Sequence, residues 1–395
     1  MKIRNLIEDV GGASRVTKRR QELFDNAEGT SKYYDPISET AKKLHPGMIR
    51  LTVSEIRPAG KTAKTIRFEA PALPYFQAGQ FLTLKMKIGS SIVTRPYSIS
   101  SASFETRGEH PFVEITVRKP KENGFAADEL LEHTKPGDVF EGEVGLGEFH
   151  YDSIRDAKHA VALAGGSGIT PFVSMAKEIR FGKLDLNLTV LYGSVNADDI
   201  ILKEELEQCA CGRVKIVHVL SGDNPDWTGE KGFLSRELIQ KYSDGDTSYF
   251  ICGPQAMYEY VKQELEALQI PKRRIRFEVF GQSADISQSE DYPSELKDRT
   301  FRLKVKQGIH ETVIDAEASE SIAVALERAS LPIHTRCRSG SCGVCRIKVL
   351  DGKYYVRPVN DGRRAEDKEF NYVHACSCYP LSDMTVRINI PVLDE

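Results

Sequence analysis

The chain has 395 residues, of which 40% are hydrophobic and 28% charged, and its formal net charge is −3. This length suits about two to four domains, and the composition is that of a globular protein. The small net charge excludes bulk attraction to nucleic acid, and no apolar run reaches the about 18–20 residues of a membrane-spanning helix. The acidic N-terminus lacks a signal-peptide core, and the eight cysteines favour metal ligands or free thiols over disulfides, so we expect a cytoplasmic protein.

Residues 1–45 form a polar extension of mixed charge ahead of the first strand pattern. Apolar residues from Ile3 to Val10 recur at helical spacing, which predicts a short amphipathic helix that ends at Gly11-Gly12. Residues 15–24 predict a second helix with a basic outer face. We favour packing of both helices on the body of the protein, and the alternative is a docking element for a partner subunit.

Residues 46–152 contain short segments in which apolar and polar residues alternate, as in 82–86 and 113–118. Glycine and proline separate these segments, so the pattern predicts an antiparallel β-barrel or sandwich. Between two expected strands lies the quartet Arg95-Pro96-Tyr97-Ser98. Further on, Gly124-Phe125-Ala126-Ala127 precedes an expected helix, whose first N–H groups can bind phosphate.

Residues 153–280 alternate strand and helix patterns, which predicts a parallel sheet with helices on both faces. The apolar run 159–164 is typical of a buried strand, and it ends in Gly165-Gly166-Ser167-Gly168-Ile169-Thr170-Pro171. Such a turn admits a pyrophosphate at a helix N-terminus, although a plain strand–helix connection is the alternative. Asp199 is expected to cap a helix that runs through Gln208.

A later expected strand of this domain ends in Cys252-Gly253-Pro254. Cys252 is either a small buried hydrophobe or part of a site. The polar, acidic residues 281–298 predict a linker, which is either a flexible tether or packed down.

Residues 299–395 predict a hairpin, a helix and further strands around a cysteine loop. Three cysteines at C-x4-C-x2-C spacing, with a fourth far downstream, match the loop of a plant-type [2Fe–2S] cluster. Gly340 and Gly343 can turn tightly and aim N–H groups at sulfur. The expected ligands are Cys337, Cys342, Cys345 and Cys376.

A structural zinc site is the alternative for these cysteines, with Cys342-x2-Cys345 as one knuckle and Cys376-x-Cys378 as the other. It leaves Cys337 and both loop glycines without a role. We therefore favour the two-iron cluster.

Taken together, these motifs resemble the ferredoxin–NADP reductase superfamily fused to a plant-type ferredoxin domain, over residues 46–395. The resemblance implies a β-barrel flavin domain (46–152), an α/β NAD domain (153–280), a linker (281–298) and a β-grasp ferredoxin domain (299–395). It also implies that the last cluster ligand stands four residues before Pro380, which selects Cys376 over Cys378.

The resemblance also assigns roles to the motifs. Arg95 would pair with the flavin phosphate, Tyr97 would stack on the flavin ring, and Ser98 would hydrogen-bond near its reactive nitrogen. Ala127 lacks the hydroxyl that the family usually has in its pyrophosphate element. The residues implied in the chemistry are Tyr97, Ser98, Cys252 and Glu278. The residues implied in cofactor binding are Arg95, Pro96, Tyr97, Ser98, Gly124, Phe125, Ala126, Ala127, Gly165, Gly166, Ser167, Gly168, Thr170, Cys252, Gly253 and Pro254.

The function implied is electron transfer from NADH through FAD and the [2Fe–2S] cluster to a partner metalloenzyme such as an oxygenase. We expect FAD rather than FMN because residues 141–152 can meet an adenosine half. We expect NADH because no arginine follows Ser221-Gly222-Asp223 and Phe233 replaces the tyrosine of NADPH-specific relatives.

Three alternatives to this function remain. They are a reductase of a hybrid cluster or nitrogen-oxide detoxifying protein, an electron-entry subunit that is inactive alone, and a zinc-stabilised binding protein. Arginines 336, 338 and 346 near the cysteine loop are candidates for contact with an acidic partner.

Overall fold

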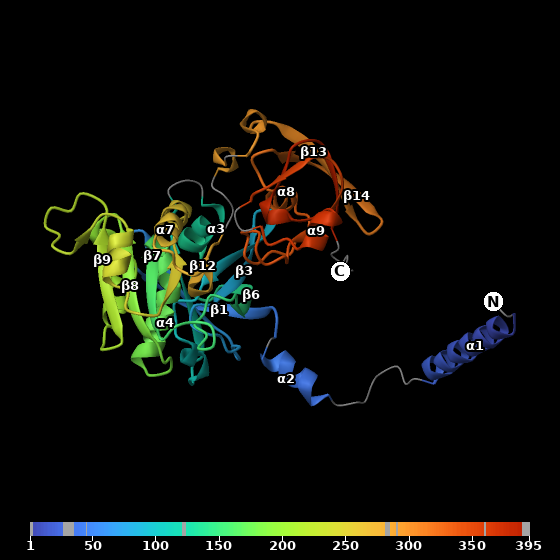
Figure 1. Cartoon of the computed structure of the whole chain (residues 1–395), viewed down its shortest axis with the longest axis horizontal. Coiled ribbons are helices and arrows are strands. Elements are labelled where there is room, and N and C mark those ends of the chain that lie inside the picture. Colours follow the sequence, from blue (N-terminus) through green and yellow to red (C-terminus); the bar gives the residue numbers. More distant parts are fainter. Residues whose placement is uncertain are drawn as a thin grey trace. The chain divides into compact units, whose positions relative to one another are not determined.

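The computed structural model describes residues 3–26, 35–44, 46–120, 124–280, 285–289, 291–358 and 361–388 (Figure 1). The chain divides into two compact units, Met1–His45 and Pro46–Glu395. None of the described helices is both long enough and apolar enough to cross a membrane.

The first unit contains α1 (Ile3–Asp25) and α2 (Pro36–Leu44). The prediction that a helix ends at Gly11-Gly12 is wrong, because α1 runs through both glycines and includes residues 15–24. Each glycine costs a helix about 1 kcal/mol relative to alanine, which a long run of helix-forming neighbours can offset. Asp35 caps the N-terminus of α2, since its carboxylate accepts hydrogen bonds from the backbone N–H groups of Ile37 and Ser38.

The flavin-type domain predicted for residues 46–152 is an antiparallel sheet of six strands in the order β4-β3-β6-β1-β2-β5. A bridge between Ile99 and Ile115 links the end of β4 to β5, so the sheet closes as a barrel. The quartet Arg95–Ser98 lies within β4 rather than between strands, which corrects our expectation. The strands are β1 (Ile49–Pro58), β2 (Ala63–Glu69), β3 (Phe81–Ile88), β4 (Ser91–Ser98), β5 (Phe112–Arg118) and β6 (Val139–Leu146).

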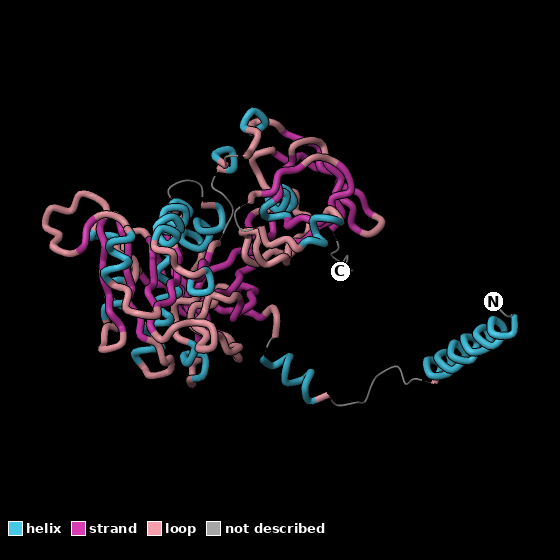
Figure 2. The backbone as a smooth tube through the Cα atoms, in the orientation of Figure 1, coloured by secondary structure: helices cyan, strands magenta, loops and turns pink. Residues whose placement is uncertain are grey.

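The α/β domain contains a six-stranded sheet in the order β10-β9-β8-β7-β11-β12, and its strands are parallel, as predicted. Figure 2 shows the strands of the chain in magenta and its helices in cyan. Alternate residues of β7 face opposite sides: Ala160 and Ala162 join the core under α4, and Val161 and Leu163 join the core under α6 and α7. The strands are β7 (His159–Gly165), β8 (Asn187–Ser194), β9 (Val214–Leu220), β10 (Glu230–Lys231), β11 (Thr247–Cys252) and β12 (Ile275–Glu278). The helices are α4 (Thr170–Arg180), α5 (Lys203–Glu207), α6 (Arg236–Lys241) and α7 (Gln255–Ala267).

The prediction that Asp199 caps a helix through Gln208 is wrong. Residues Ala197–Asp199 form a short turn, and α5 begins only after Leu202, which has a left-handed backbone (φ 55°). The Asp199 carboxylate instead accepts hydrogen bonds from the backbone N–H of Thr62, on the barrel, and from the side chain of Arg118.

The C-terminal domain has a five-stranded sheet in the order β14-β13-β19-β15-β17 and a small pair, β16 and β18, as expected for an α+β fold. Helix α8 (Ile322–Arg328) packs Ile322 and Leu326 into the core with Val305 and Ile347. The strands are β13 (Thr300–Gln307), β14 (His310–Glu317), β15 (Arg346–Asp351), β16 (Tyr354–Val356), β17 (Tyr372–His374), β18 (Cys378–Pro380) and β19 (Met384–Ile388).

The described part of the expected linker is packed down rather than free. Ile286 is 1% exposed and Tyr292 is 5% exposed, and both contact Tyr379 of the C-terminal domain. The Tyr292 hydroxyl donates to the Ala318 carbonyl oxygen at 2.8 Å. Residues 281–284 and 290 lie outside the described residues.

Candidate functional site

A cavity of about 900 Å³ is lined by residues of both the barrel and the α/β domain. The barrel contributes the end of β4, and the α/β domain contributes the ends of its central strands. Ligands of parallel sheets bind at the carboxyl ends of the strands, so this is where a nucleotide is expected. The predicted residues that line the cavity are Pro96, Tyr97, Ser98, Gly165, Gly166, Ser167, Gly168, Thr170, Cys252, Gly253, Pro254 and Glu278.

The glycine turn and the cysteine corner are brought together by the pairing of β7 with β11. Cys252 lies opposite Ala164 in the sheet, directly before the turn. A Cβ at Gly168 would lie 2.1 Å from the Cys252 carbonyl oxygen, so only glycine fits there. Close backbone approach therefore explains why glycine is needed at Gly168.

Ser98, Cys252 and Glu278 meet at one end of the cavity. Glu278 pairs with Cys252 in the sheet, and the Ser98 hydroxyl donates to Glu278 Oε2 at 2.9 Å. Burial raises the pKa of Glu278 well above its ordinary range, although the Ser98 hydrogen bond opposes this. Burial also raises the pKa of the Cys252 thiol, and nearby Glu278 adds to the shift. In both groups the shift favours the neutral, protonated form.

Arg118 is a cavity residue that the sequence patterns did not single out. Its Nη1 lies 2.8 Å from the position that a Cβ of Gly166 would occupy, so the guanidinium reaches the glycine turn. Its Nη2 lies 3.1 Å from Asp199 Oδ2. A cation beside a glycine turn is suited to a pyrophosphate. The sequence offered one signal for this role, because Arg118 is a charged residue at the end of the alternating segment 113–118.

Aromatic residues of the cavity were also missed from sequence. Phe233 and Tyr260 line the cavity with ring centroids 5.9 Å apart, and Phe280 lines it after β12. Flat rings of this kind can stack on planar heterocycles. The sequence marked Phe233 only as the replacement of a tyrosine.

Arg95 and residues 124–127, which were predicted to bind the flavin, are not among the described residues that line this cavity. Residues 141–152 do not line it either. Arg95 Nη1 instead contacts Glu327, at 3.1 Å from Oε1. The Gly124 N–H donates to Asp128 Oδ2 at 3.1 Å, which occupies a donor expected to bind phosphate. The helix after it, α3 (Phe125–Asp128), has only four residues.

The predicted cluster cysteines gather in one loop and the turn after β17. Cys345 Sγ and Cys376 Sγ are 3.3 Å apart. The Cys337 sulfur interacts with Cys342 and with Cys376, and it accepts a backbone hydrogen bond from Cys342 at 3.4 Å. Cys342 is exposed, and the other three cysteines are buried.

The backbone of the loop is unusual in ways that suit sulfur ligation. Gly340 and Gly343 have positive φ angles of 91° and 74°, as the sequence led us to expect of tight turns. The Ser339 N–H also donates to Cys337 Sγ at 3.5 Å. Donors aimed at sulfur stabilise a thiolate rather than a thiol. Cys378 lies in β18 with its side chain in the domain core.

This arrangement fits a two-iron cluster better than one zinc ion. Cys337 contacts Cys342, and Cys345 contacts Cys376, so the loop and the turn offer two pairs of thiols. Two pairs suit two irons, each bound by two thiolates. A bound cluster would draw its ligands from the four cysteines of the loop and turn.

The three arginines expected to face a partner are engaged within the chain. Arg338 is buried and pairs with Glu327, Arg336 pairs with Glu143, and Arg346 pairs with Asp367. The expectation of exposed positive charge is therefore wrong for Arg338.

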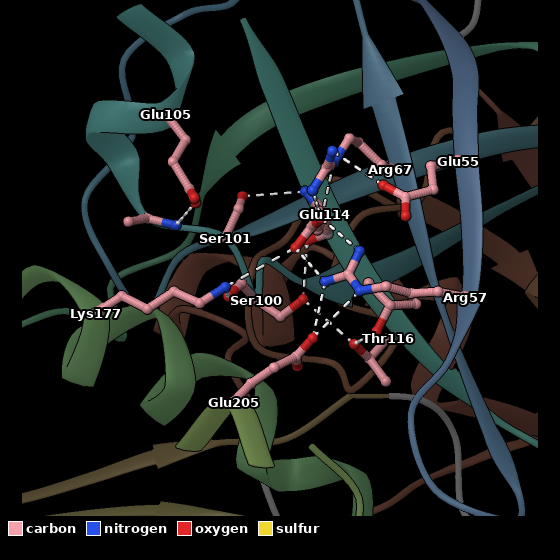
Figure 3. Close-up of polar contacts among 12 residues, drawn as sticks. Glu55, Arg57, Arg67, Ser100, Ser101, Glu105, Glu114, Thr116, Lys177 and Glu205 are labelled. Atoms are coloured by element: carbon pink, nitrogen blue, oxygen red, sulfur yellow. Dashed lines mark hydrogen bonds and ion pairs between the residues drawn. The ribbon is translucent and has the colours of Figure 1, made fainter. Parts of the chain in front are cut away.

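A buried carboxylate, Glu114 on β5, fastens the barrel to the α/β domain (Figure 3). Arg57 donates to both of its oxygens, at 2.6 and 2.9 Å, and also contacts Glu205 of α5 at 2.9 Å. Arg67 and, from α4, Lys177 approach the same carboxylate. Burial alone would raise the pKa of Glu114, but these cations lower it. The network joins strands β1, β2 and β5 of the barrel to helices α4 and α5 of the α/β domain.

Three family models match the chain in succession. "Oxidoreductase FAD-binding domain" matches residues 50–151, "Oxidoreductase NAD-binding domain" matches residues 162–263, and "2Fe-2S iron-sulfur cluster binding domain" matches residues 305–381. Their order is that of the barrel, the α/β domain and the C-terminal domain.

Several curated proteins are similar to the chain over most of its length. "NADH oxidoreductase HCR" of Escherichia coli (strain K12) is 28% identical over 312 residues, which cover 79% of this chain and 88% of the relative. A glycine betaine monooxygenase reductase subunit of Chromohalobacter salexigens is 26% identical, with 81% and 89% covered. NADH-cytochrome b5 reductase 2 of Aspergillus niger is 31% identical, with 54% and 68% covered.

The fold is that of a solved reductase. The structure of phthalate dioxygenase reductase superposes with a TM-score of 0.63 at 24% identity, covering 87% of this chain and 98% of the other. The order of the three matched domains and the fold confirm the resemblance inferred from the motifs. The chain belongs to the ferredoxin–NADP reductase superfamily, as a member that carries a C-terminal [2Fe–2S] ferredoxin domain.

Proposed function

We propose that this protein is an NADH-dependent reductase that delivers single electrons, through FAD and a [2Fe–2S] cluster, to a partner metalloenzyme such as an oxygenase. The observation that carries this proposal is the cavity that the end of β4 shares with the glycine turn and the Cys252 corner. The bound cofactors supply hydride acceptance and one-electron transfer, and the protein supplies binding and orientation.

The glycine turn and Arg118 would hold the pyrophosphate of NADH, and Cys252-Gly253-Pro254 would lie beside its nicotinamide. Arg118 is the only Lys or Arg among the described residues that line the cavity, and it is already paired with Asp199. A second phosphate on the ribose would thus find no free cation there. This supports NADH over NADPH.

On the flavin side, Tyr97 and Ser98 would orient the ring, and Arg95 would pair with the flavin phosphate. Burial raises the pKa of Tyr97, so its phenol stays neutral. A neutral ring is suited to stacking on the flavin. The Ser98 hydroxyl donates to Glu278 Oε2, and this hydrogen bond would hold the Ser98 proton in one orientation. Gly124-Phe125-Ala126-Ala127 would contact the rest of the cofactor.

Cys337, Cys342, Cys345 and Cys376 would ligate the cluster. Support comes from the short Cys345–Cys376 contact, from the backbone donors to Cys337 and from the position of Cys378 within β18.

Two kinds of relative favour an oxygenase as the acceptor: the reductase subunit of a glycine betaine monooxygenase and a component of 1,2-phenylacetyl-CoA epoxidase. The alternative is a reductase of a hybrid cluster or nitrogen-oxide detoxifying protein. The third candidate is an electron-entry subunit that needs its complex for turnover.

The test is anaerobic mixing of the cofactor-loaded chain with NADH or with NADPH, followed by flavin and cluster absorbance. We expect NADH to reduce both chromophores and NADPH to react much more slowly. Reduction of ferricyanide by the isolated chain would separate a reductase from an electron-entry subunit. Chromophores that stay oxidised with both nucleotides would overturn the proposal.

Cys376→Ser and Cys378→Ser form a matched pair for the cluster assignment. We expect Cys376→Ser to lose iron and cytochrome c reduction while it keeps ferricyanide reduction. Cys378→Ser should keep both activities. Loss of iron in the second variant alone would refute the assignment of Cys376.

A further inference from the structure

Arg95 and Arg338 share one buried carboxylate, that of Glu327. Arg95 Nη1 lies 3.1 Å from Oε1 and 3.2 Å from Oε2. Arg338 approaches with two nitrogens, at 2.5 Å from Oε1 and 3.0 Å from Oε2. Glu327 is 4% exposed and Arg338 is 3% exposed, so water does not screen these contacts.

The three residues come from elements with separate tasks. Arg95 lies on β4, the strand that carries Tyr97 and Ser98, and Glu327 lies in the last turn of α8. Arg338 follows Cys337 in the cluster loop and has a left-handed backbone (φ 57°), which costs a non-glycine residue energy. Glu327 thus connects the flavin strand directly to the cluster loop.

Further contacts follow the same seam between the ferredoxin domain and the barrel. The Ser330 hydroxyl donates to the Ser90 carbonyl oxygen at 2.6 Å, next to β4. Arg336 Nε and Nη2 contact the two oxygens of Glu143 on β6, at 2.8 and 3.0 Å. The segment from Ser330 to Arg336, which leads into the cluster loop, is therefore fastened to the barrel at both of its ends.

The charges explain why the carboxylate matters. Burial and the neighbouring Arg338 lower the pKa of Arg95, and Glu327 opposes both effects. Without the carboxylate, two guanidinium groups would face each other with little water between them. Like charges in a site of low dielectric repel strongly, so the seam would open.

We propose that Glu327 is a positioning residue for electron transfer: its carboxylate seats the cluster loop on the flavin strand and so fixes the flavin-to-cluster distance. This inference rests on the proposed function, because it assigns a residue to one step of that function. The carboxylate of Glu327 acts through Arg95 and Arg338, with which it pairs, and not through the cluster cysteines themselves.

Glu320 offers a matched control on the same domain. Its carboxylate pairs with Arg328 at 2.5 Å, a contact that stays within the ferredoxin domain. Glu327→Gln and Glu320→Gln each remove one charge from an ion pair with arginine. Only the first variant removes a bridge to the barrel.

The experiment is stopped-flow reduction of the cofactor-loaded full chain by NADH. In Glu327→Gln we expect flavin-to-cluster transfer to slow about tenfold or more, because small misplacement of a reacting centre is costly. In protein loaded to the wild-type flavin content, flavin reduction by NADH and ferricyanide turnover should stay within about twofold, since the cavity residues are unchanged and Arg95 keeps its charge. Glu320→Gln should match the wild type in every step.

A second readout does not depend on turnover. Amide hydrogen exchange of Ser91–Ser98 should accelerate in Glu327→Gln and not in Glu320→Gln, because the seam no longer covers β4. If Glu327→Gln loses iron, Glu143→Gln tests the same seam from the barrel side and should also slow flavin-to-cluster transfer.

Wild-type transfer rates and exchange in Glu327→Gln would overturn the inference, as would equal slowing in Glu320→Gln. Failure of the proposed function has a different signature. In that case NADH would reduce neither chromophore, in the wild type as in the variants.

Discussion

At Gly168 even a single added methyl group would clash with backbone atoms. A methyl group there would lie 2.1 Å from the Cys252 carbonyl oxygen and 2.6 Å from the Gly253 nitrogen, both backbone atoms that cannot turn aside. We expect Gly168→Ala to lower the free energy of unfolding by about 1–3 kcal/mol, as overpacking does. It should also raise the KM for NADH, measured by steady-state ferricyanide reduction.

Gly212 provides the control, because a Cβ there would meet no atom within 4 Å. Gly212→Ala should leave the KM for NADH at the wild-type value. Equal effects of the two variants would show that loss of glycine, and not the clash at Cys252, is responsible.

The buried Glu278 should make the stability of the protein depend on pH. Its pKa is raised by burial in the folded chain, so the folded state binds more protons than the unfolded state above the unfolded pKa of about 4.3. Stability from this group therefore falls as the pH rises toward the folded pKa. We expect the Tm advantage of Glu278→Gln over the wild type to grow across that window and then to level off.

The measurement is thermal unfolding of both proteins across the range from weakly acidic to weakly alkaline pH, under one buffer ionic strength. Parallel Tm curves would mean that Glu278 does not titrate with a raised pKa.

At the scale of elements, Glu114 joins β1, β2, α4 and α5 through the network of Figure 3. We expect Glu114→Gln to cost about 1–3 kcal/mol of unfolding free energy, because the partly buried Arg57 loses one of its two carboxylate partners and keeps only Glu205. The NADH-to-flavin step should slow as well, since Lys177 and Glu205 lie on helices of the α/β domain. Denaturant unfolding and stopped-flow flavin bleaching measure the two effects.

The pH dependence gives this prediction a second check. The pKa of Glu114 is lowered in the folded chain, so its contribution is complete above the unfolded pKa of about 4.3 and is lost in acid. The difference in unfolding free energy between the wild type and Glu114→Gln should therefore narrow as the pH falls. Glu141→Gln, which removes an exposed pair with Lys85, should change stability little at any pH.

Periodicity predicted most elements because one face of each strand or helix is buried. The segments 113–118 and 159–164 became β5 and β7, and the spacing from Ile322 to Ala329 became α8. The prediction ended the first helix too early, because it treated Gly11 and Gly12 as a helix end, whereas α1 continues through them.

Contacts between distant segments could not be predicted in this way. Local pattern gave no reason for Arg118 to meet the glycine turn, since the two belong to different domains. For the same reason Arg338 was expected on the surface, although it is buried against Glu327. The motifs predicted which residues line the cavity, and the tertiary fold decided which charges they meet.

At the scale of the whole molecule, residues 1–45 form a separate unit. They lie outside the three stretches that the family models match, 50–151, 162–263 and 305–381. We expect a chain without residues 1–45 to keep its flavin, its iron and its ferricyanide turnover. A fall in Tm would favour packing on the body, whereas loss of activity only with the physiological acceptor would favour the docking element.

The contacts of the ferredoxin domain with the barrel at Glu327 and Glu143 have a kinetic consequence. A domain fastened in this way does not carry its cluster to the flavin by diffusion, so the internal hop of each electron involves no excursion through solvent. Its speed should be the same in buffer and in thick glycerol, and what varies with crowding is only the encounter with the next protein.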